Sequence, residues 1–167
     1  PHRITSEDIE HQLAPVAERL GLSPGTIRML TGVVARRFWD QGSRLSDLAA
    51  RAGQRALEAA GIDRDRVGLP INTSVCQDYL EPSVASSVHS RLRLPARCLN
   101  FDIGNACLGF LNGMQVAAMM IERGQIDYAL LVDAESSRQV TESTIARLSS
   151  RSSTSQDLRD DFATLTL

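Results

Sequence analysis

The sequence of 167 residues contains no lysine, so all 18 of its basic residues are arginine. They are outnumbered by 20 acidic residues, and the net charge of -2 leaves no basic excess to neutralise a phosphate backbone. Aromatic residues make up only 4% of the chain, too few for a platform on which nucleic-acid bases stack. No apolar run approaches the roughly 20 residues that cross a bilayer. These absences argue against a nucleic-acid partner and against a membrane span.

Cysteine is also scarce, with Cys76, Cys98 and Cys107 at wide spacing. An odd number of widely spaced cysteines indicates neither a disulfide framework nor a paired metal motif, so no metal site is predicted. This cysteine usage favours a reducing cytoplasm as the location of the protein. In contrast, 43% of the residues are apolar and 23% are charged, which is typical of a folded protein with a substantial core.

Strands and helices are predicted to alternate along the chain. Apolar residues that recur every three or four positions predict helices over 6–20 with a break near Pro15, in a short segment after Pro24, and over 45–60, 83–92 and 107–123. Continuous apolar runs predict buried strands at 67–75, 98–103 and 128–132. Strands and helices in this order predict an α/β fold, with parallel strands joined by helical crossovers and covered on both faces.

The two ends of the chain suggest a longer protein. Residues 149–157, SSRSSTSQD, are the only low-complexity stretch and are predicted to be a solvated surface loop. Residues 162–167, FATLTL, have the pattern of a strand, and no strand is expected before the first helix. The chain is therefore expected to lack both its opening strand and the part that would follow residue 167.

Cys107 carries the strongest chemical signal. It follows a tight connection, GNA at 104–106, between a predicted strand and the predicted helix 107–123. Unpaired N–H groups and the helix dipole at a helix N-terminus favour a thiolate, which is the nucleophilic form of cysteine. The same N–H groups can receive the oxyanion of a thioester under attack. The alternative is a buried cysteine that acts only as a small apolar residue.

The remaining cysteines and the histidine carry weaker signals. Cys76 and Cys98 lie next to predicted strands, where packing roles are expected. His89 is the only histidine beyond the first eleven residues, but nothing in its helix directs it toward Cys107. A role on the side of its own helix is therefore favoured over a Cys–His pair.

Two acidic residues lie in the connection after the first predicted strand. Asp78 and Glu81 occur in QDYLEPS, and such connections line the ligand crevice of open α/β sheets. A carboxylate at this place acts as a general base or is simply a solvated loop charge. The residue types alone leave both interpretations open.

The segment GNACLGFLNGM at 104–114, together with INTSV, LNFDI and ERGQIDYALLVDAE around it, resembles the thiolase-fold condensing enzymes and is most similar to ketoacyl-ACP synthase III. The resemblance extends over residues 31–133, and ATLTL fits it too. It implies a thiolase-like α/β fold, of which this chain is the first half of a layered αβαβα sandwich with a mostly parallel mixed sheet. Cys107 matches the nucleophile that accepts an acyl group. The family's catalytic His and Asn have no counterpart in this chain, and His89 does not match that histidine.

QDYLEPS resembles one branch of this family, the OleA enzymes. Ordinary synthases carry an aromatic residue at the place of Glu81, whereas OleA enzymes carry a glutamate and join two long acyl-CoA chains head to head. In that branch the glutamate reaches into the neighbouring subunit and acts as the base. The resemblance therefore implies that Glu81 is a second catalytic residue and that the protein is a dimer, either of identical subunits or with a related thiolase-fold subunit.

The function that the resemblance implies is an acyltransferase that catalyses Claisen condensation through an acyl-Cys107 intermediate and joins two fatty acyl-CoA molecules to a β-keto product. No cofactor beyond the substrates, acyl-CoA or acyl-ACP, is implied. The CoA-clamping tryptophan and arginine of ordinary synthases would fall near Thr26 and Leu30, so a carrier-protein donor stays open. One alternative is a decarboxylating synthase that uses malonyl-ACP, and another is a non-catalytic partner subunit. Residues 1–167 by themselves are expected to be inactive.

Overall fold

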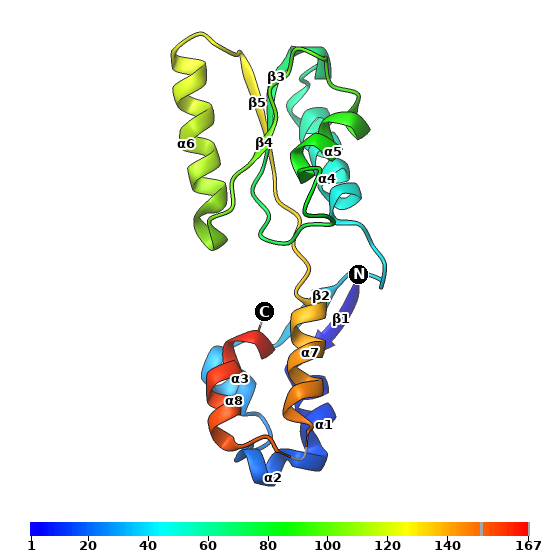
Figure 1. Cartoon of the computed structure of the whole chain (residues 1–167), viewed down its shortest axis with the longest axis vertical. Helices are drawn as coiled ribbons and strands as arrows, with labels where there is room; N and C mark the ends of the chain where they lie inside the picture. Colours follow the sequence, from blue (N-terminus) through cyan, green and yellow to red (C-terminus); the bar gives the residue numbers. More distant parts are fainter. Residues whose placement is uncertain (151, 167) are drawn as a thin grey trace. The chain divides into compact units, whose positions relative to one another are not determined.

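The structure is a computed structural model that describes residues 1–150 and 152–166. The chain divides into two compact units. One unit is Gly42–Glu135, and the other combines Pro1–Gln41 with the described part of Ser136–Leu167. Figure 1 follows the chain through both units. No helix in the described residues is both long enough and apolar enough to cross a membrane.

The unit Gly42–Glu135 is built on a parallel sheet of three strands. The central strand β3 (Val67–Asn72) lies between β4 (Phe101–Asp102) and β5 (Tyr128–Val132). Ile71 of β3 is in register with Phe101 on one side and with Leu131 on the other. The predicted parallel pairing is confirmed, although the strand expected over 98–103 is regular for two residues only.

Helices cover both faces of this sheet, as the sequence predicts (Figure 1). Helices α4 (Leu45–Ala60) and α5 (Val84–Leu92) lie on one face, and α6 (Gly109–Glu122) lies on the other. Between α4, α5 and the sheet is a core of buried apolar residues that includes Val67, Val88 and Leu130. Leu69 and Ile71 face α6 and are fully buried. A short 3-10 helix, η2 (Arg64–Arg66), precedes β3.

The orientation of α6 differs from the expectation. The apolar side predicted from the sequence contains Leu108, Leu111, Met114, Ala117, Ala118 and Ile121, and of these only Ala117 is buried. Gly109, Gly113 and Ala117, which recur at every fourth position, are buried against the sheet, and Val116 and Met120 pack beside them. Other large apolar side chains of α6 are exposed, and Leu111 is 60% exposed. Small residues allow the helix axis to approach the sheet closely. In this helix, close packing on the sheet outweighs the burial of the larger apolar side chains.

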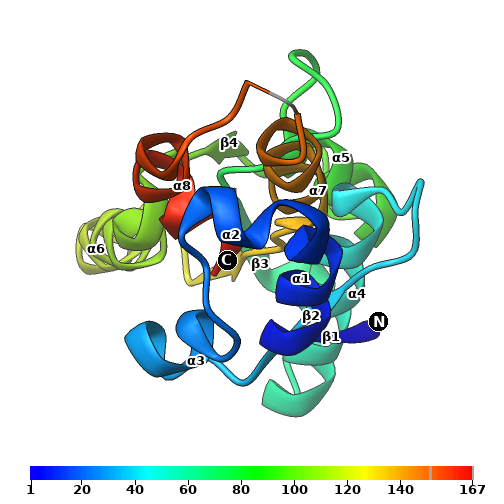
Figure 2. The same cartoon turned by 90° about the horizontal axis from the view of Figure 1, so that it is seen from below.

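The second unit combines both ends of the chain. Its helices are α1 (Ser6–Leu13), α2 (Ala17–Leu20), α3 (Thr26–Thr31), α7 (Arg138–Leu148) and α8 (Ser155–Asp161). The predicted break near Pro15 is confirmed as a 3-10 turn, η1 (Ala14–Val16). Helix α1 packs on α7, and α2 packs on α8 (Figure 2). The buried core contains Ile9, Leu13 and Leu148, so α7, which the sequence analysis leaves unassigned, completes it.

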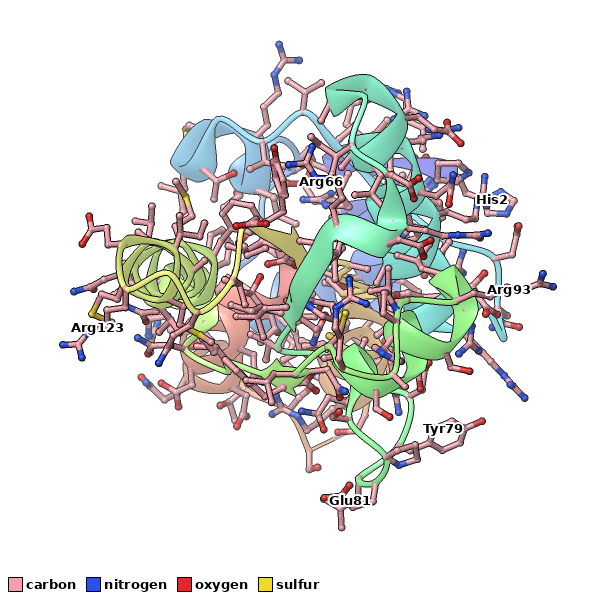
Figure 3. The ribbon with its side chains drawn as sticks, turned by 90° about the horizontal axis from the view of Figure 1, so that it is seen from above. His2, Arg66, Tyr79, Glu81, Arg93 and Arg123 are labelled. Atoms are coloured by element: carbon pink, nitrogen blue, oxygen red, sulfur yellow. The ribbon has the colours of Figure 1, made fainter. Side chains whose placement is uncertain are left out.

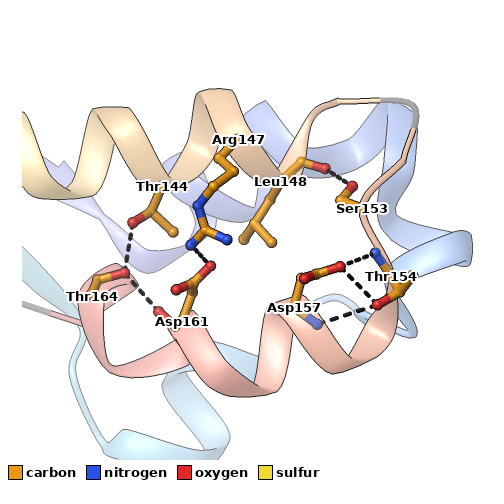
Figure 4. Close-up of polar contacts among 8 residues, drawn as sticks. All are labelled: Thr144, Arg147, Leu148, Ser153, Thr154, Asp157, Asp161 and Thr164. Carbon is orange, nitrogen blue, oxygen red and sulfur yellow. Dashed lines mark hydrogen bonds and ion pairs between the residues drawn. The ribbon is translucent and has the colours of Figure 1, made fainter.

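Two expectations about strands at the chain ends are wrong. A strand does precede the first helix, since β1 (His2–Thr5) pairs antiparallel with β2 (Ala35–Phe38). Of FATLTL, Phe162–Leu165 form a 3-10 turn, η4, and Leu167 lies outside the described residues. Thr164 explains the turn, because its hydroxyl donates to the Asp161 carbonyl and pairs with the Thr144 hydroxyl (Figure 4). These groups bond to neighbouring helices, and no strand lies beside η4 in this part of the chain.

The Ser-rich stretch 149–157 is only partly the solvated loop that we expect. Ser153 is buried, and its hydroxyl donates to the Leu148 carbonyl at the end of α7 (Figure 4). Thr154 and Asp157 form a capping box, in which each side chain accepts from the other residue's backbone N–H at 3.3 and 2.7 Å. Residues 155–157 therefore begin α8, because a cap residue of this type starts a helix. Residue 151 lies outside the described residues.

The burial of Ile71 predicts its energetic weight. Replacing Ile71 with Ala removes a fully buried side chain between the sheet and α6 and leaves a cavity. The free energy of unfolding should fall by about 2–5 kcal/mol, measured by urea denaturation. Leu99→Ala is the matched control, because Leu99 is 57% exposed on the same unit and should cost less than about 1 kcal/mol. Equal losses for the two variants would contradict the packing described here.

Candidate functional site

Cys107 lies at the elbow between β4 and α6. The connection of residues 103–105 leads into a 3-10 turn, η3 (Ala106–Leu108), and α6 begins directly after it. The helix therefore begins two residues later than predicted, and Cys107 occupies the turn at its N-terminal end. The side chain of Cys107 is exposed. Since the helix dipole is positive at this end, the site suits a group that is or becomes negatively charged.

The backbone at the elbow is unusual. Ala106 has a φ of 43°, in the left-handed region that residues with a Cβ rarely adopt. Such conformations persist where the surrounding structure imposes them, and they cluster at functional sites. The Leu108 N–H donates to the Asn105 carbonyl at 3.0 Å, and the Asn105 amide donates to Asn112 of α6 at 2.6 Å. These bonds tie the strained turn to the first turns of α6.

Gly109 sets how closely the elbow approaches the sheet. A Cβ at this position would lie 2.9 Å from the carbonyl oxygen of Thr73 and 3.1 Å from that of Ile103. These are backbone atoms beyond the ends of β3 and β4, so they cannot move aside as a flexible side chain can. The Thr73 hydroxyl also donates to the Asp133 carboxylate at 3.0 Å, after the end of β5. The elbow that carries Cys107 is thus packed against the carboxyl ends of β3 and β4, and Thr73 links this place to the end of β5.

The other cysteines and the histidine do not take part in this elbow. Cys98 is buried, its thiol donates to the Val67 carbonyl at 2.6 Å, and desolvation raises the pKa of that thiol. Its predicted packing role is confirmed. Cys76 is half-buried and its backbone N–H is hydrogen-bonded. The His89 ring is hydrogen-bonded to the Pro95 carbonyl at 3.0 Å, just after the end of its own helix α5. None of them is hydrogen-bonded to Cys107.

Asp78 has a structural role that its residue type does not reveal. Its carboxylate accepts from the backbone N–H groups of Leu45 at 2.6 Å and of Ser46 at 3.0 Å. These are the first residues of α4, so Asp78 caps that helix from 33 residues along the chain. Burial alone would raise the pKa of the Asp78 carboxyl, but the hydrogen bonds from Ser46 and Leu45 outweigh it and lower that pKa.

Glu81 lies at the tip of the loop between β3 and α5. Its side chain is exposed, and it points away from the unit together with Tyr79 (Figure 3). Leu80 between them is 93% exposed. No hydrogen bond links Glu81 to Cys107 in the described chain, so the structure does not bring the two predicted catalytic residues together.

Clusters of metal-ligating side chains and pockets are the features that could hold a metal or a cofactor in the described residues. No group of three or more His, Cys, Asp or Glu side chains that could hold a metal ion occurs among them. One pocket lies at the amino ends of the strands, where Arg97 and Gln125 line it, and another lies beside Glu10 and Leu22 in the other unit. Cys107 lines neither of them.

Solved structures with this fold identify the class of protein. The chain superposes on OleA of Xanthomonas campestris with a TM-score of 0.95 and 46% sequence identity, over 100% of this chain and 51% of that one. A second structure of the same protein, with bound lauric acid and lauroyl-CoA, matches equally well. The fold is thus that of a thiolase-like protein, and the chain corresponds to about half of one.

Sequence comparisons give the family. The profile of 3-oxoacyl-[acyl-carrier-protein] synthase III matches residues 101–153. The chain is 47% identical to the acyl-CoA:acyl-CoA alkyltransferase of Xanthomonas campestris over 100% of its own length, and 36% identical to that of Shewanella oneidensis over 99%. It spans about half the length of these relatives, 49% and 47%. The chain belongs to the synthase III family of thiolase-fold proteins and is similar to its OleA branch, as its motifs predict.

The close approach at Gly109 can be tested by adding one methyl group. Gly109→Ala should lower the free energy of unfolding by about 1–3 kcal/mol, because two backbone carbonyls must move. Gly104→Ala is the matched control in the same elbow, since a Cβ at position 104 meets nothing within 4 Å. It should change stability by no more than about 0.5 kcal/mol. Thermal or urea unfolding of both variants measures the difference, and a neutral Gly109→Ala would refute the steric argument.

Proposed function

We propose that this chain belongs to an acyltransferase that joins two fatty acyl-CoA molecules by Claisen condensation, with Cys107 as the residue that carries the first acyl group. The observation that carries the proposal is the exposed Cys107 at the strained elbow before α6, inside the segment that matches the synthase III family. The similarity to two acyl-CoA:acyl-CoA alkyltransferases favours acyl-CoA as both substrates.

The relatives also support the choice of the two catalytic residues. One structure of Xanthomonas campestris OleA, with lauric acid and lauroyl-CoA bound, has a cysteine replaced by serine. In two others a glutamate is replaced by aspartate or by glutamine. The replaced glutamate and cysteine are separated by the same number of positions as Glu81 and Cys107. This spacing supports Glu81 and Cys107 as their counterparts.

In the proposed reaction, the Cys107 thiolate attacks the carbonyl carbon of the first acyl-CoA and expels the CoA thiolate. The positive end of the α6 dipole stabilises the oxyanion of that addition. The Glu81 carboxylate then removes a proton from the α-carbon of the second acyl-CoA. The resulting carbanion attacks the acyl-Cys107 carbonyl, a carbon–carbon bond forms, and the Cys107 thiolate leaves. The product is a β-keto thioester.

The position of Glu81 favours action in a neighbouring subunit. Glu81 points outward at the tip of its loop, and Leu80 beside it is almost fully exposed (Figure 3). Tyr79 is also about half exposed, so the tip presents neighbouring apolar side chains that another subunit can cover. The outward face of α6, with Leu111 and Met114 more than half exposed, likewise suits a further packed layer. A dimer in which Glu81 of one subunit completes the site of the other is therefore part of the proposal.

A second candidate is the decarboxylating synthase, in which loss of CO₂ from malonyl-ACP supplies the carbanion without a base. One similarity favours it, because the β-ketoacyl-[acyl-carrier-protein] synthase III of Rhodospirillum rubrum is 36% identical over 73% of this chain. A carboxylate at position 81 has no task in that reaction. A non-catalytic partner subunit is a third possibility, and the exposed Cys107 argues against it.

The role of Cys107 predicts the outcome of its substitution. In the full-length protein, Cys107→Ser should abolish covalent capture of the acyl group, because a serine hydroxyl lacks thiolate character. Incubation with [14C]acyl-CoA followed by protein mass spectrometry measures the transfer. The buried Cys98→Ser is the matched control and should still become labelled. Label on Cys76, or undiminished label in Cys107→Ser, would overturn the assignment.

Glu81 predicts a different pattern of loss. Glu81→Ala should still allow acylation of Cys107 but slow the condensation of two acyl-CoA molecules by about 10²–10⁴-fold, the usual loss when a general base is removed. Release of CoA in the first turnover and formation of the β-keto product are measured separately. Full activity with malonyl-ACP that is unaffected by Glu81→Ala would support the decarboxylating candidate instead.

Action across the dimer has its own test. When Cys107→Ala and Glu81→Ala subunits are mixed, heterodimers should contain one site in which both residues are intact. Condensation activity should therefore recover in the mixture although each homodimer is inactive. Absence of recovery in verified heterodimers would mean that Glu81 serves its own subunit or has no catalytic role.

A further inference from the structure

The loop that carries Glu81 is held at both ends by carboxylates from other parts of the unit. Near its start, the Glu135 carboxylate accepts from the backbone N–H groups of Val75 at 2.5 Å and of Cys76 at 3.2 Å. Glu135 follows β5 and is 60 residues from Val75 along the chain. Val75 and Cys76 lie in the loop, so these two bonds hold the loop backbone itself.

The other end of the loop is held in the same way. Asp102, the last residue of β4, accepts from the N–H groups of Val84 at 2.9 Å and of Ala85 at 2.8 Å, at the start of α5. Between these two anchors, Asp78 joins the loop to the N-terminus of α4. Each of the three carboxylates therefore accepts two backbone hydrogen bonds. Hydrogen bonds to an ionised carboxylate are among the stronger ones in proteins.

The anchors enclose a short free segment. Only residues 79–83 separate Asp78 from the start of α5, and Tyr79, Leu80 and Glu81 form its exposed tip. A segment this short, fixed on both sides, has few conformations available. The direction in which the tip projects is consequently well defined.

We propose that Glu135, Asp78 and Asp102 are positioning residues that hold Glu81 where it can reach the α-carbon of the second substrate. This inference rests on the proposed role of Glu81 as the base. A base must lie within hydrogen-bond reach of the proton that it removes, and a displacement of about 1 Å can cost about 100-fold in rate. An exposed carboxylate on a five-residue tip meets that demand only if the ends of the tip are fixed.

A purely structural role makes a different prediction. If the three carboxylates only stabilise α4, α5 and the sheet, their loss should weaken acylation of Cys107 and condensation to the same degree. If they position Glu81, their loss should leave acylation unchanged and slow condensation alone. Glu135 separates the two explanations best, because its bonds to Val75 and Cys76 hold loop backbone, whereas Asp78 and Asp102 bind the first residues of α4 and α5.

The experiment compares Glu135→Gln and Asp78→Asn in the full-length protein. Each substitution keeps the side-chain size and one acceptor oxygen. It replaces the other oxygen with an amide nitrogen, which cannot accept a hydrogen bond. Condensation should slow by about 10–100-fold while the first-turnover release of CoA stays within twofold. Asp63→Asn is the matched control, because Asp63 accepts from the Asp65 N–H at 3.0 Å in a turn remote from the loop. It should alter neither rate.

Combining these changes with Glu81→Ala separates the possible outcomes. If Glu135 acts through Glu81, Glu135→Gln should lower the residual rate of Glu81→Ala no further. The positioning role would be overturned if Glu135→Gln slowed acylation and condensation equally. It would also be overturned if Glu135→Gln slowed condensation in the Glu81→Ala background as much as it does alone. Normal condensation in Glu81→Ala itself would instead refute the proposed base, and the positioning role with it. If Glu135→Gln does not fold, Asp78→Asn is compared instead, and a first-turnover release of CoA within twofold of normal shows that the lost cap of α4 does not account for slower condensation.

Discussion

The close approach of α6 to the sheet is the constraint on which the site depends. Gly109, Gly113 and Ala117 face the strands, and a Cβ at Gly109 would collide with two backbone carbonyls beyond the strand ends. Dense packing of this kind leaves no room for adjustment. The start of α6, and with it the turn that holds Cys107, is thereby placed against the carboxyl ends of β3 and β4.

The same packing explains the apolar outer face of α6. Gly109, Gly113 and Ala117 are buried against the sheet, whereas larger side chains such as Leu111 and Met114 are left exposed. A helix that is apolar on both faces is typical of a layer inside a larger sandwich. This arrangement agrees with a chain that spans about half of its relatives.

Backbone hydrogen bonds to carboxylates organise the opposite side of the unit. Asp78, Asp102 and Glu135 each hold two N–H groups, and together they define where the loop tip with Glu81 begins and ends. Acidic residues in a sequence like this are easily taken for catalytic groups or for solvated charges. In this unit Asp78, Asp102 and Glu135 have a third role, which is to accept hydrogen bonds from the N–H groups of helix starts and of the loop.

The sequence by itself determined the features that depend on neighbouring residues. Local periodicity and capping residues predict the helix over 45–60 and its end at Gly61, which is in the left-handed conformation. Local patterns also predict the parallel strands and the cysteine at a strand-to-helix elbow. Only the tertiary structure decided which face of α6 is buried, that Phe162–Leu165 turn instead of extending, and that β1 pairs with β2. It also decided that Asp78 caps α4 and that Glu135 holds a loop 60 residues away. These outcomes depend on contacts between distant parts of the chain, and local residue patterns carry no information about which distant groups will meet.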